Sequence, residues 1–410
     1  MSHSLPLEVR FLKRYARRLH EGGVPAHQLE GLVESVAVAV GYRCEIWSSP
    51  TAVLMAVRQP DDDEDQQPLP MQLIRLRPGP VNLANTTELY ALAEDLQEQR
   101  IDLESAYEAL RSRDVTPLYP ASVRVMSSGL VSGAFALMLA TGWLGAATAA
   151  LAGMLVGLLS TSESRALREG NLDAVAAVLV TLLVYGLNHH LAGIDPTAVI
   201  LSGLIYLVPG LSLTIAVTEL STDHLSSGSA RLAGAGVTLL KLVLGVVIGT
   251  VVAHWLGWDA PGDRLSSVMA PPAWVQWPSL LVAALGFGVL FSVRPVDFPL
   301  AVLAAVTSYV VSRFASAMGG VEFGVLVAAF AVAVLGNSLG RLLRLPASLV
   351  RVPGIILLVP GALGYRAVTN LLLHGTANPQ ETALTVAILL VSLVGGLLIG
   401  NTVVPPRRHV

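Results

Sequence analysis

Two proline–glycine pairs lie near the middle of long apolar segments, and each pair follows Leu-Val. They are Pro209 with Gly210 and Pro360 with Gly361. Proline lacks the backbone donor that an α-helix requires, and its ring clashes with the preceding turn. Each pair therefore predicts a broken helix. A simple proline kink is the alternative for either pair taken alone.

A broken helix would expose the start of its second half near Leu211 and Ser212 in the first copy and near Ala362 in the second. The positive end of a helix dipole favours a negatively charged group. Freed backbone groups at membrane depth are tolerated only inside protein or beside a water-filled cavity. Two such helix starts facing one cavity would suit the carboxylate of an amino acid or an organic acid.

Two basic residues could supply positive charge to the same cavity. Arg366 follows the second pair by about one and a half helical turns, and Lys241 is expected about 14 Å deep in the next apolar segment after the first pair. Charges at such depth are costly and are functional candidates by default. We expect both residues to bind the negative end of the substrate, with a structural ion pair as the alternative role of Arg366.

Two acids occupy corresponding positions in the chain. Asp173 follows Gly-Asn-Leu, Glu322 follows Gly-Gly-Val, and each begins an apolar segment. A desolvated carboxylate has a raised pKa and can take up and release a proton near neutral pH. Asp173 and Glu322 are therefore candidates for proton coupling, and a helix N-cap is the alternative role of each.

The composition places these residues in a membrane protein. Hydrophobic residues make up 53% of the 410 residues and charged residues only 13%, against roughly 25% charged in soluble domains. A net charge of −3 gives no electrostatic case for nucleic acid. A spanning helix needs about 20 apolar residues. Ten segments approach this length, at 123–142, 143–160, 172–192, 196–219, 232–256, 274–292, 296–312, 319–339, 348–373 and 381–402.

Residues 1–120 predict a small α/β head that precedes the spans. Its helices and three short strands carry no catalytic signature, and we expect His20 and His27 to be surface residues. Cys44 is the only cysteine, which excludes a disulfide framework or a multi-cysteine metal site within one chain. We expect no enzyme, no cofactor and no metal, and the absence of a Walker motif argues against ATP-driven transport.

An internal repeat relates the two broken segments. Residues 203–220 read GLIYLVPGLSLTIAVTEL and residues 354–371 read GIILLVPGALGYRAVTNL. These copies lie in the fourth and ninth apolar segments, so the repeat unit is five spans, over 121–257 and 274–404. An odd number of spans inverts the second copy, which is a transporter architecture. A duplication without functional trace is the alternative. The fold class predicted is thus a helical polytopic membrane protein with a 5+5 inverted repeat.

These features resemble the threonine/serine exporter family, in its single-chain form with a cytoplasmic head and ten spans. The resemblance covers nearly the whole chain. It rests on the helix pair of residues 11–41, on Asn82 and Leu83, on VILSGLIYLVPGLSLTIAVTEL, on SSGSARL and on RVPGIILLVPG. Membership implies export of threonine, serine or similar solutes, driven by the proton gradient. Some relatives are linked to dicarboxylate export.

The function expected is therefore a secondary transporter that exports small amino acids by alternating access across a bacterial inner membrane. Its partners are the small-molecule substrate, protons and the lipid bilayer. A dicarboxylate exporter is the nearest alternative, and a channel or a membrane-anchored regulatory protein is the alternative of another class. Small residues would permit close helix packing and a homodimer; they are Gly129, Gly133, Gly153, Gly157, Gly245 and Gly249.

Basic residues in alternate loops predict that both termini are cytoplasmic and that loops 257–273 and 373–381 are external. A cysteine placed at residue 262 should react with an impermeant maleimide added to intact cells. Labelling of that cysteine only from the cytoplasmic side would overturn the topology.

Overall fold

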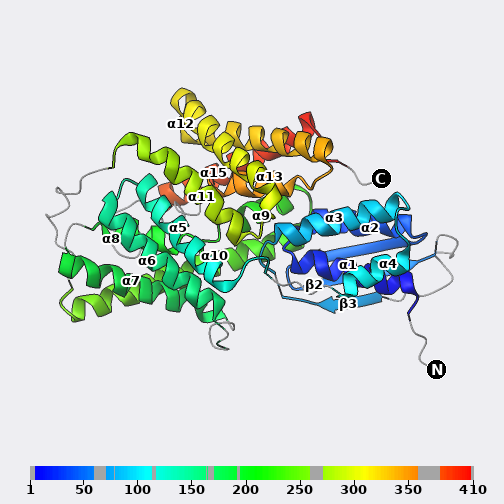
Figure 1. The fold of residues 1–410 in the computed structure, drawn as a ribbon, viewed down its shortest axis with the longest axis horizontal. Coiled ribbons are helices and arrows are strands. Elements are labelled where there is room, and N and C mark those ends of the chain that lie inside the picture. The colour runs from blue at the N-terminus through cyan, green and yellow to red at the C-terminus, as the bar shows by residue number, and fades with distance from the viewer. Residues whose placement is uncertain are drawn as a thin grey trace.

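The computed structural model describes residues 5–59, 71–77, 79–112, 117–162, 164, 170–191, 194–258, 271–358 and 379–407. Pro360, Gly361, Ala362 and Arg366 lie outside these ranges, as do most residues of the two loops expected to be external. The described chain is mostly helical and has a small sheet near the N-terminus (Figure 1).

The head is an α/β domain with its own hydrophobic core. Its elements are α1 (Leu7–Glu21), α2 (Ala26–Ala39), β1 (Arg43–Ser49), β2 (Ala52–Arg58), β3 (Met71–Arg75), α3 (Leu83–Gln97) and α4 (Leu103–Ser112). The three strands pair antiparallel in the order β1-β2-β3, and a tight turn joins Ser49 to Ala52. Phe11, Tyr15 and Leu19 are fully buried, which confirms the apolar helical face expected from their spacing.

The remaining elements form a helical bundle beside the head. They are α5 (Ala121–Met138), α6 (Gly142–Thr161), α7 (Leu172–Leu191), α8 (Pro196–Leu204), α9 (Gly210–Ser221), α10 (Leu225–Trp255), η3 (Ala273–Val275), α11 (Gln276–Leu290), η4 (Pro295–Asp297), α12 (Phe298–Leu343), α13 (Ser348–Ile356) and α15 (Pro379–Val403). Within the described residues, seven helices are long and apolar enough to cross a membrane. The chain is therefore a multi-pass membrane protein.

The fourth apolar segment is broken where the sequence predicts. Asp195 caps the start of α8, where its Oδ1 accepts from the backbone N of Thr197 at 3.0 Å. The helix ends at Leu204, and α9 begins at Gly210 directly after Pro209. With 9 and 12 residues, α8 and α9 are each too short to span the hydrocarbon core alone.

Helix α12 contains two limbs joined at a bend. Its 46 residues would extend for about 69 Å as one straight helix, more than twice the thickness of the hydrocarbon core. Gly319 and Gly320 have non-helical backbone angles, and φ of Gly320 is 86°. A Cβ on Gly324 would lie 1.9 Å from Oγ of Ser316, so the chain folds back closely at this point. The two limbs occupy the seventh and eighth expected spans.

Two helix pairs pack through the same glycine register. A Cβ on Gly245 of α10 would lie 2.4 Å from the carbonyl O of Ala174 on α7. A Cβ on Gly396 of α15 would lie 2.2 Å from the carbonyl O of Leu326 on α12. Gly249 and Gly400, one turn later, approach their partner helices in the same way. The separation from Gly245 to Gly396 equals that between the two Leu-Val-Pro-Gly copies.

The two pairs run in opposite directions relative to the head. Helix α10 starts beside the head, where Arg231 and head residue Ala26 share the carboxylate of Glu219, and it ends at Trp255. Helix α15 instead ends beside the head, where Arg407 just beyond it pairs with Glu94 of α3. Pairs α7–α10 and α12–α15 therefore share a packing register but have opposite polarity.

The glycines that suggested a homodimer are used inside the chain. Gly129 and Gly133 of α5 face α6, and Gly153 and Gly157 of α6 face α5. Gly245 and Gly249 face α7. Helix packing within one chain accounts for all six, so they do not argue for a second copy.

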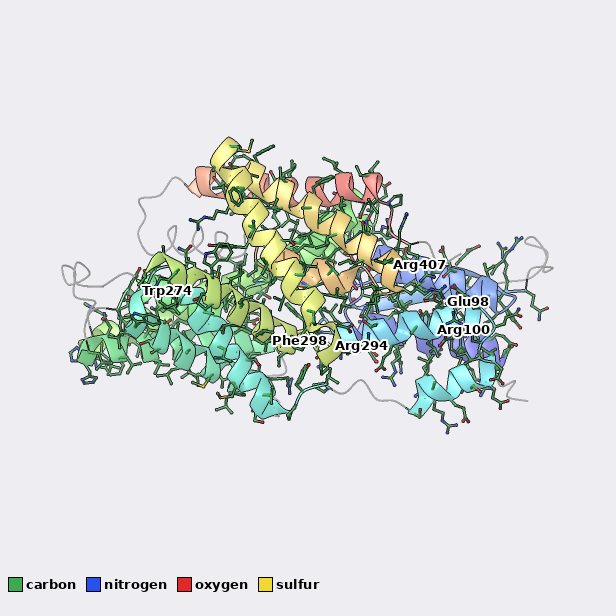
Figure 2. The ribbon with its side chains drawn as sticks, turned by 45° about the horizontal axis from the view of Figure 1, so that its top comes forward. Glu98, Arg100, Trp274, Arg294, Phe298 and Arg407 are labelled. Atoms are coloured by element: carbon green, nitrogen blue, oxygen red, sulfur yellow. The ribbon has the colours of Figure 1, made fainter. Side chains whose placement is uncertain are left out.

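Exposed tryptophans mark the end of the bundle opposite the head. Trp143 follows α5, Trp255 ends α10, and Trp274 and Trp277 begin the η3–α11 segment, and all four side chains are exposed. Figure 2 shows Trp274 at this far end and Arg294 and Phe298 toward the head. Tryptophan concentrates at membrane–water interfaces. These four tryptophans therefore indicate the membrane surface far from the head.

The head is joined to the bundle through the stacked ends of two helices. At the start of α3, the backbone N of Leu83 donates to Phe291 O, and that of Ala84 to Ser292 O, both at 3.0 Å. These carbonyls end α11, so free donors of one helix satisfy free acceptors of the other. The side chain of Asn82 caps α3 by accepting from the backbone N of Asn85.

The glycine register is testable with a matched pair of substitutions in α10. Gly245→Ala places a Cβ against the α7 backbone, and such overpacking costs about 1–3 kcal/mol. Gly234→Ala meets nothing within 4 Å and should leave stability unchanged or raise it slightly. Thermal unfolding of the full chain in detergent would compare them. Equal melting temperatures for the two variants would contradict the close α7–α10 contact.

Candidate functional site

The residues expected at the first helix break line the junction of bundle and head. Gly210 is buried at the start of α9, and Pro209 and Ser212 are partly buried beside it. Leu211 lines a cavity of about 90 Å³ together with residues of α13, α15 and the head. The broken segment therefore opens toward the head, which the sequence did not indicate.

Lys241 and Asp173 come together at the start of α7. The Nζ of Lys241 donates to the carbonyl O of Gly170 at 2.8 Å, and its charge acts on the carboxylate of Asp173. Helix α10 extends four turns toward the head before it meets α7. Lys241 therefore lies level with the first turn of α7.

Glu322 lies at the opposite end of the bundle, two residues beyond the bend in α12. Gly320 precedes it with φ of 86°, and Gly170 precedes Asp173 with φ of 102°. Each acid thus follows a glycine in a backbone conformation that residues with a Cβ rarely adopt. The two acids therefore have similar local surroundings in α7 and α12, but they lie at opposite ends of the bundle.

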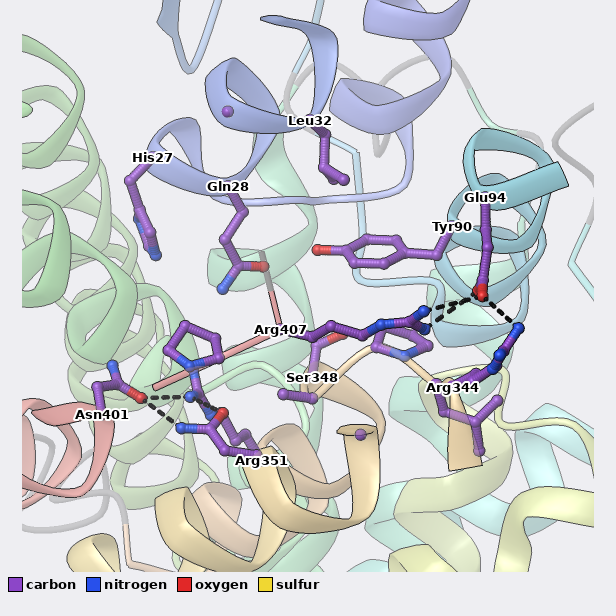
Figure 3. A pocket seen from close by; sticks show the side chains of 17 residues that line it. His27, Gln28, Leu32, Tyr90, Glu94, Arg344, Ser348, Arg351, Asn401 and Arg407 are labelled. Carbon is purple, nitrogen blue, oxygen red and sulfur yellow. Dashed lines mark hydrogen bonds and ion pairs between the residues drawn. The ribbon is translucent and has the colours of Figure 1, made fainter. Parts of the chain in front are cut away.

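A larger cavity of about 370 Å³ lies between the head and the bundle. Figure 3 shows His27, Gln28, Tyr90 and Glu94 of the head facing residues that come from the ends of bundle helices. The bundle supplies Asn337, Arg344, Ser348, Arg351 and Asn401, and Arg407 follows α15. Five residues also line the smaller cavity beside α9, so the two cavities adjoin; they are His27, Gln28, Ser348, Arg351 and Asn401.

Arg351 is held by two asparagines from different helices. Its Nη2 donates to Oδ1 of Asn337 on α12 and to Oδ1 of Asn401 on α15. Nδ2 of Asn337 donates to Oδ1 of Asn401 at 3.0 Å. This network of hydrogen bonds links three helices. It fixes a guanidinium at the point where α12, α13 and α15 meet the head.

Glu94 joins the head to two further arginines. Arg344 Nη1 lies 3.2 Å from Glu94 Oε1, and Arg407 Nη2 lies 3.0 Å from the same oxygen. Burial by itself raises the pKa of Glu94, but the hydrogen bond and charge of Arg407, with the charge of Arg344, hold the pKa below its ordinary value. Among the described lining residues, three arginines thus face one glutamate, and the cavity is electropositive.

The head contributes neutral polar groups to the same cavity. Burial lowers the pKa of His27 to about 4, and this outweighs the opposing effect of Glu219. The imidazole is therefore neutral at pH 7. Burial also raises the pKa of Tyr90 to about 12, against the opposing charge of Arg351. We expected both histidines at the surface, but the bundle partly covers His27, and His20 is buried and bonded to Ser49 O at 3.1 Å.

Glu219 connects the broken segment to the head beside these cavities. Its carboxylate is fully buried and accepts from Arg231 Nε at 3.1 Å and from Ser227 Oγ at 2.9 Å. It also accepts from the backbone N of Ala26, the first residue of α2, at 2.9 Å. One side chain on α9 thus neutralises Arg231 and caps a helix of the head.

Family models cover most of the chain with the same elements. A model for threonine/serine exporters, ThrE, matches residues 10–253, and a second, ThrE_2, matches residues 278–403. The first match includes the head, the broken segment and Glu219 with Arg231, and the second includes Asn337, Arg351 and Asn401. This chain belongs to the threonine/serine exporter family.

Curated relatives of this exporter-family chain are fungal membrane proteins. Pheromone-regulated membrane protein 10 of Kluyveromyces lactis is 24% identical over 404 residues, covering 96% of this chain and 42% of its own. The protein of that name from Eremothecium gossypii is 21% identical and covers 87% of this chain and 48% of its own. The chain spans less than half the length of these relatives. No solved structure matches it.

Sequence reasoning missed Arg351 and Glu219 as site residues. Their positions could have identified them, because Glu219 lies within the first repeated segment and Arg351 lies just before the second. Each has a polar partner elsewhere in the chain that only the fold brings near.

Removing the Glu219 carboxylate should loosen the head. Glu219→Ala leaves the partly buried Arg231 without its charge partner, which costs about 1–3 kcal/mol, and removes the cap of α2. Thermal unfolding in detergent should show this loss, and hydrogen exchange should show reduced protection at the start of α2. As the control, Glu45→Ala removes a largely exposed partner of Arg58 and should cost less than about 1 kcal/mol. Unchanged protection of α2 in Glu219→Ala would contradict this role of Glu219.

Proposed function

We propose that this chain is a secondary transporter that exports small amino acids, threonine or serine first, by alternating access of two inverted five-span halves. The observation that carries the proposal is the glycine register shared by the α7–α10 and α12–α15 pairs, which run in opposite directions. Inverted repeats give a transporter two related states, one open to each side of the membrane.

The broken fourth segment supports a transport pathway. The break at Pro209 and Gly210 frees backbone groups that only a protein interior or an aqueous cavity can satisfy. We place its counterpart at Pro360, Gly361 and Ala362, with Arg366 as a cationic contact for the substrate. An electropositive cavity adjoining α9 favours a substrate with a carboxylate, and this also keeps dicarboxylates such as succinate as the second candidate.

Proton coupling is assigned to the two acids that follow glycines with positive φ. Asp173 lies at the head-side start of α7, and Glu322 lies beyond the bend at the far end of α12. Lys241 lies beside Asp173, so we now place it in the proton pathway and not among the substrate contacts. The head and both termini are proposed to be cytoplasmic, with the inner membrane as the location.

Counterflow in proteoliposomes tests transport directly. Labelled threonine or serine should accumulate transiently in vesicles preloaded with the unlabelled solute, and succinate should do so only if dicarboxylates are carried. Pro209→Ala should restore a continuous helix and reduce counterflow severalfold while the protein stays inserted. Failure of all three solutes to exchange through the parent protein would reject the proposed function.

The same vesicles separate coupling from exchange. With a pH step across the membrane, Asp173→Asn or Glu322→Gln should lose driven accumulation and keep exchange. If both variants accumulate solute like the parent, the acids are helix caps and the proton path lies elsewhere.

A further inference from the structure

Three buried polar atoms lack hydrogen-bond partners among the described residues and belong to side chains that line the same two adjoining cavities. They are Nδ1 of His27, Oγ of Ser348 and Nε of Arg351. A buried polar atom left without a partner costs about 1–3 kcal/mol. One such atom would be unremarkable, but three around one space indicate that a polar ligand completes the site.

The three groups define what that ligand carries. Arg351 is a cation whose Nη2 is already used by Asn337 and Asn401, so the guanidinium is oriented, and its buried Nε has no hydrogen-bond partner among the described residues. Ser348 offers a hydroxyl, and His27 is neutral and can donate or accept. A cation with two neutral hydrogen-bonding groups matches a carboxylate that has a second polar substituent nearby.

The surrounding charges favour an anionic group over a cationic one. Arg407 pairs with Glu94, and Arg344 pairs with both Glu94 and Glu98, so among the described ion pairs Arg351 is the lining arginine that no carboxylate neutralises. The volume of about 370 Å³ lies at the lower end of the range for small-molecule sites, which begins near 300 Å³. The space suits a metabolite of amino-acid size with a few waters and does not suit a large lipid.

We propose that this cavity is the head-side loading site of the transporter, where Arg351, Ser348 and His27 bind the carboxylate end of a small solute. The inference rests on the proposed transport function for the class of its ligand. Because His27 belongs to the head and the other two residues to the bundle, the site exists only while the head is docked. The smaller adjoining cavity leads from these side chains to Leu211 and Thr214 of α9, next to the helix break.

Equilibrium binding to the purified full chain in detergent tests the site without any transport step. Threonine and succinate would be titrated beside threonine methyl ester, which lacks the free carboxylate, and inorganic phosphate. We expect threonine or succinate to bind and the ester to bind at least tenfold more weakly. Phosphate binding as tight as the better carboxylate would overturn a site built for carboxylates.

Variants assign the binding to these side chains. Arg351→Gln should weaken carboxylate binding at least thirtyfold, whereas Arg341→Gln, an exposed arginine outside the described cavity lining, should bind like the parent. Ser348→Ala removes a hydroxyl that has no described partner, so it should preserve melting temperature and weaken binding severalfold. Parental affinity in both Arg351→Gln and Ser348→Ala would overturn the inference.

Binding and transport can fail separately. Carboxylate binding that depends on Arg351, in a protein that shows no counterflow, would reject the transport proposal and retain the site. Counterflow that persists with parental affinity in both variants would reject the site and retain the transporter.

Discussion

The buried carboxylate of Glu219 is the constraint on which the arrangement of head and bundle depends. Helix α9 has only 12 residues, and isolated helices of that length are marginal in water. Glu219, near its C-terminal end, is neutralised by Arg231 of α10 and bonded to the first turn of α2. The carboxylate therefore fixes a broken helix at one end and leaves the other end, at Gly210, beside the cavities. Its burial is tolerable only because two separate helices, α2 and α10, supply donors.

The two halves share packing but differ in polar residues. Glycine spacing, helix partners and the Leu-Val-Pro-Gly copies all recur at nearly constant separation along the chain. In contrast, Arg351 corresponds to Ile200 at that same separation, and Asn401 to Thr250. Close helix packing in a membrane requires small residues wherever backbones approach, so both halves keep them. The second half meets the head through the arginine and asparagine cluster, whereas the first half meets it through Glu219 and Arg231.

The sequence could predict the elements better than the site. Apolar length located the seven long apolar helices of the described residues, proline chemistry located the break before α9, and helical spacing identified the buried face of Phe11, Tyr15 and Leu19. Each of these signals is local. Arg351 and His27 could not be recognised, because their environments come from segments hundreds of residues apart in the chain. The neighbours of Lys241 could not be recognised for a related reason, because only the contact of α10 with α7 brings Lys241 to the start of α7.

A site shared by the head and the bundle links ligand binding to the docking of the head. If the solute binds only when His27 of the head faces Arg351 and Ser348, ligand binding stabilises the docked head by the same free energy by which docking strengthens ligand binding. The contacts that already hold the head are the stacked ends of α3 and α11, Glu94 with its two arginines, and Glu219. These contacts prepare the cavity in advance, so little ligand binding energy is spent on ordering it. In the proposed transporter the head then acts as one wall of the pathway, which gives a physical reason for its presence on the chain.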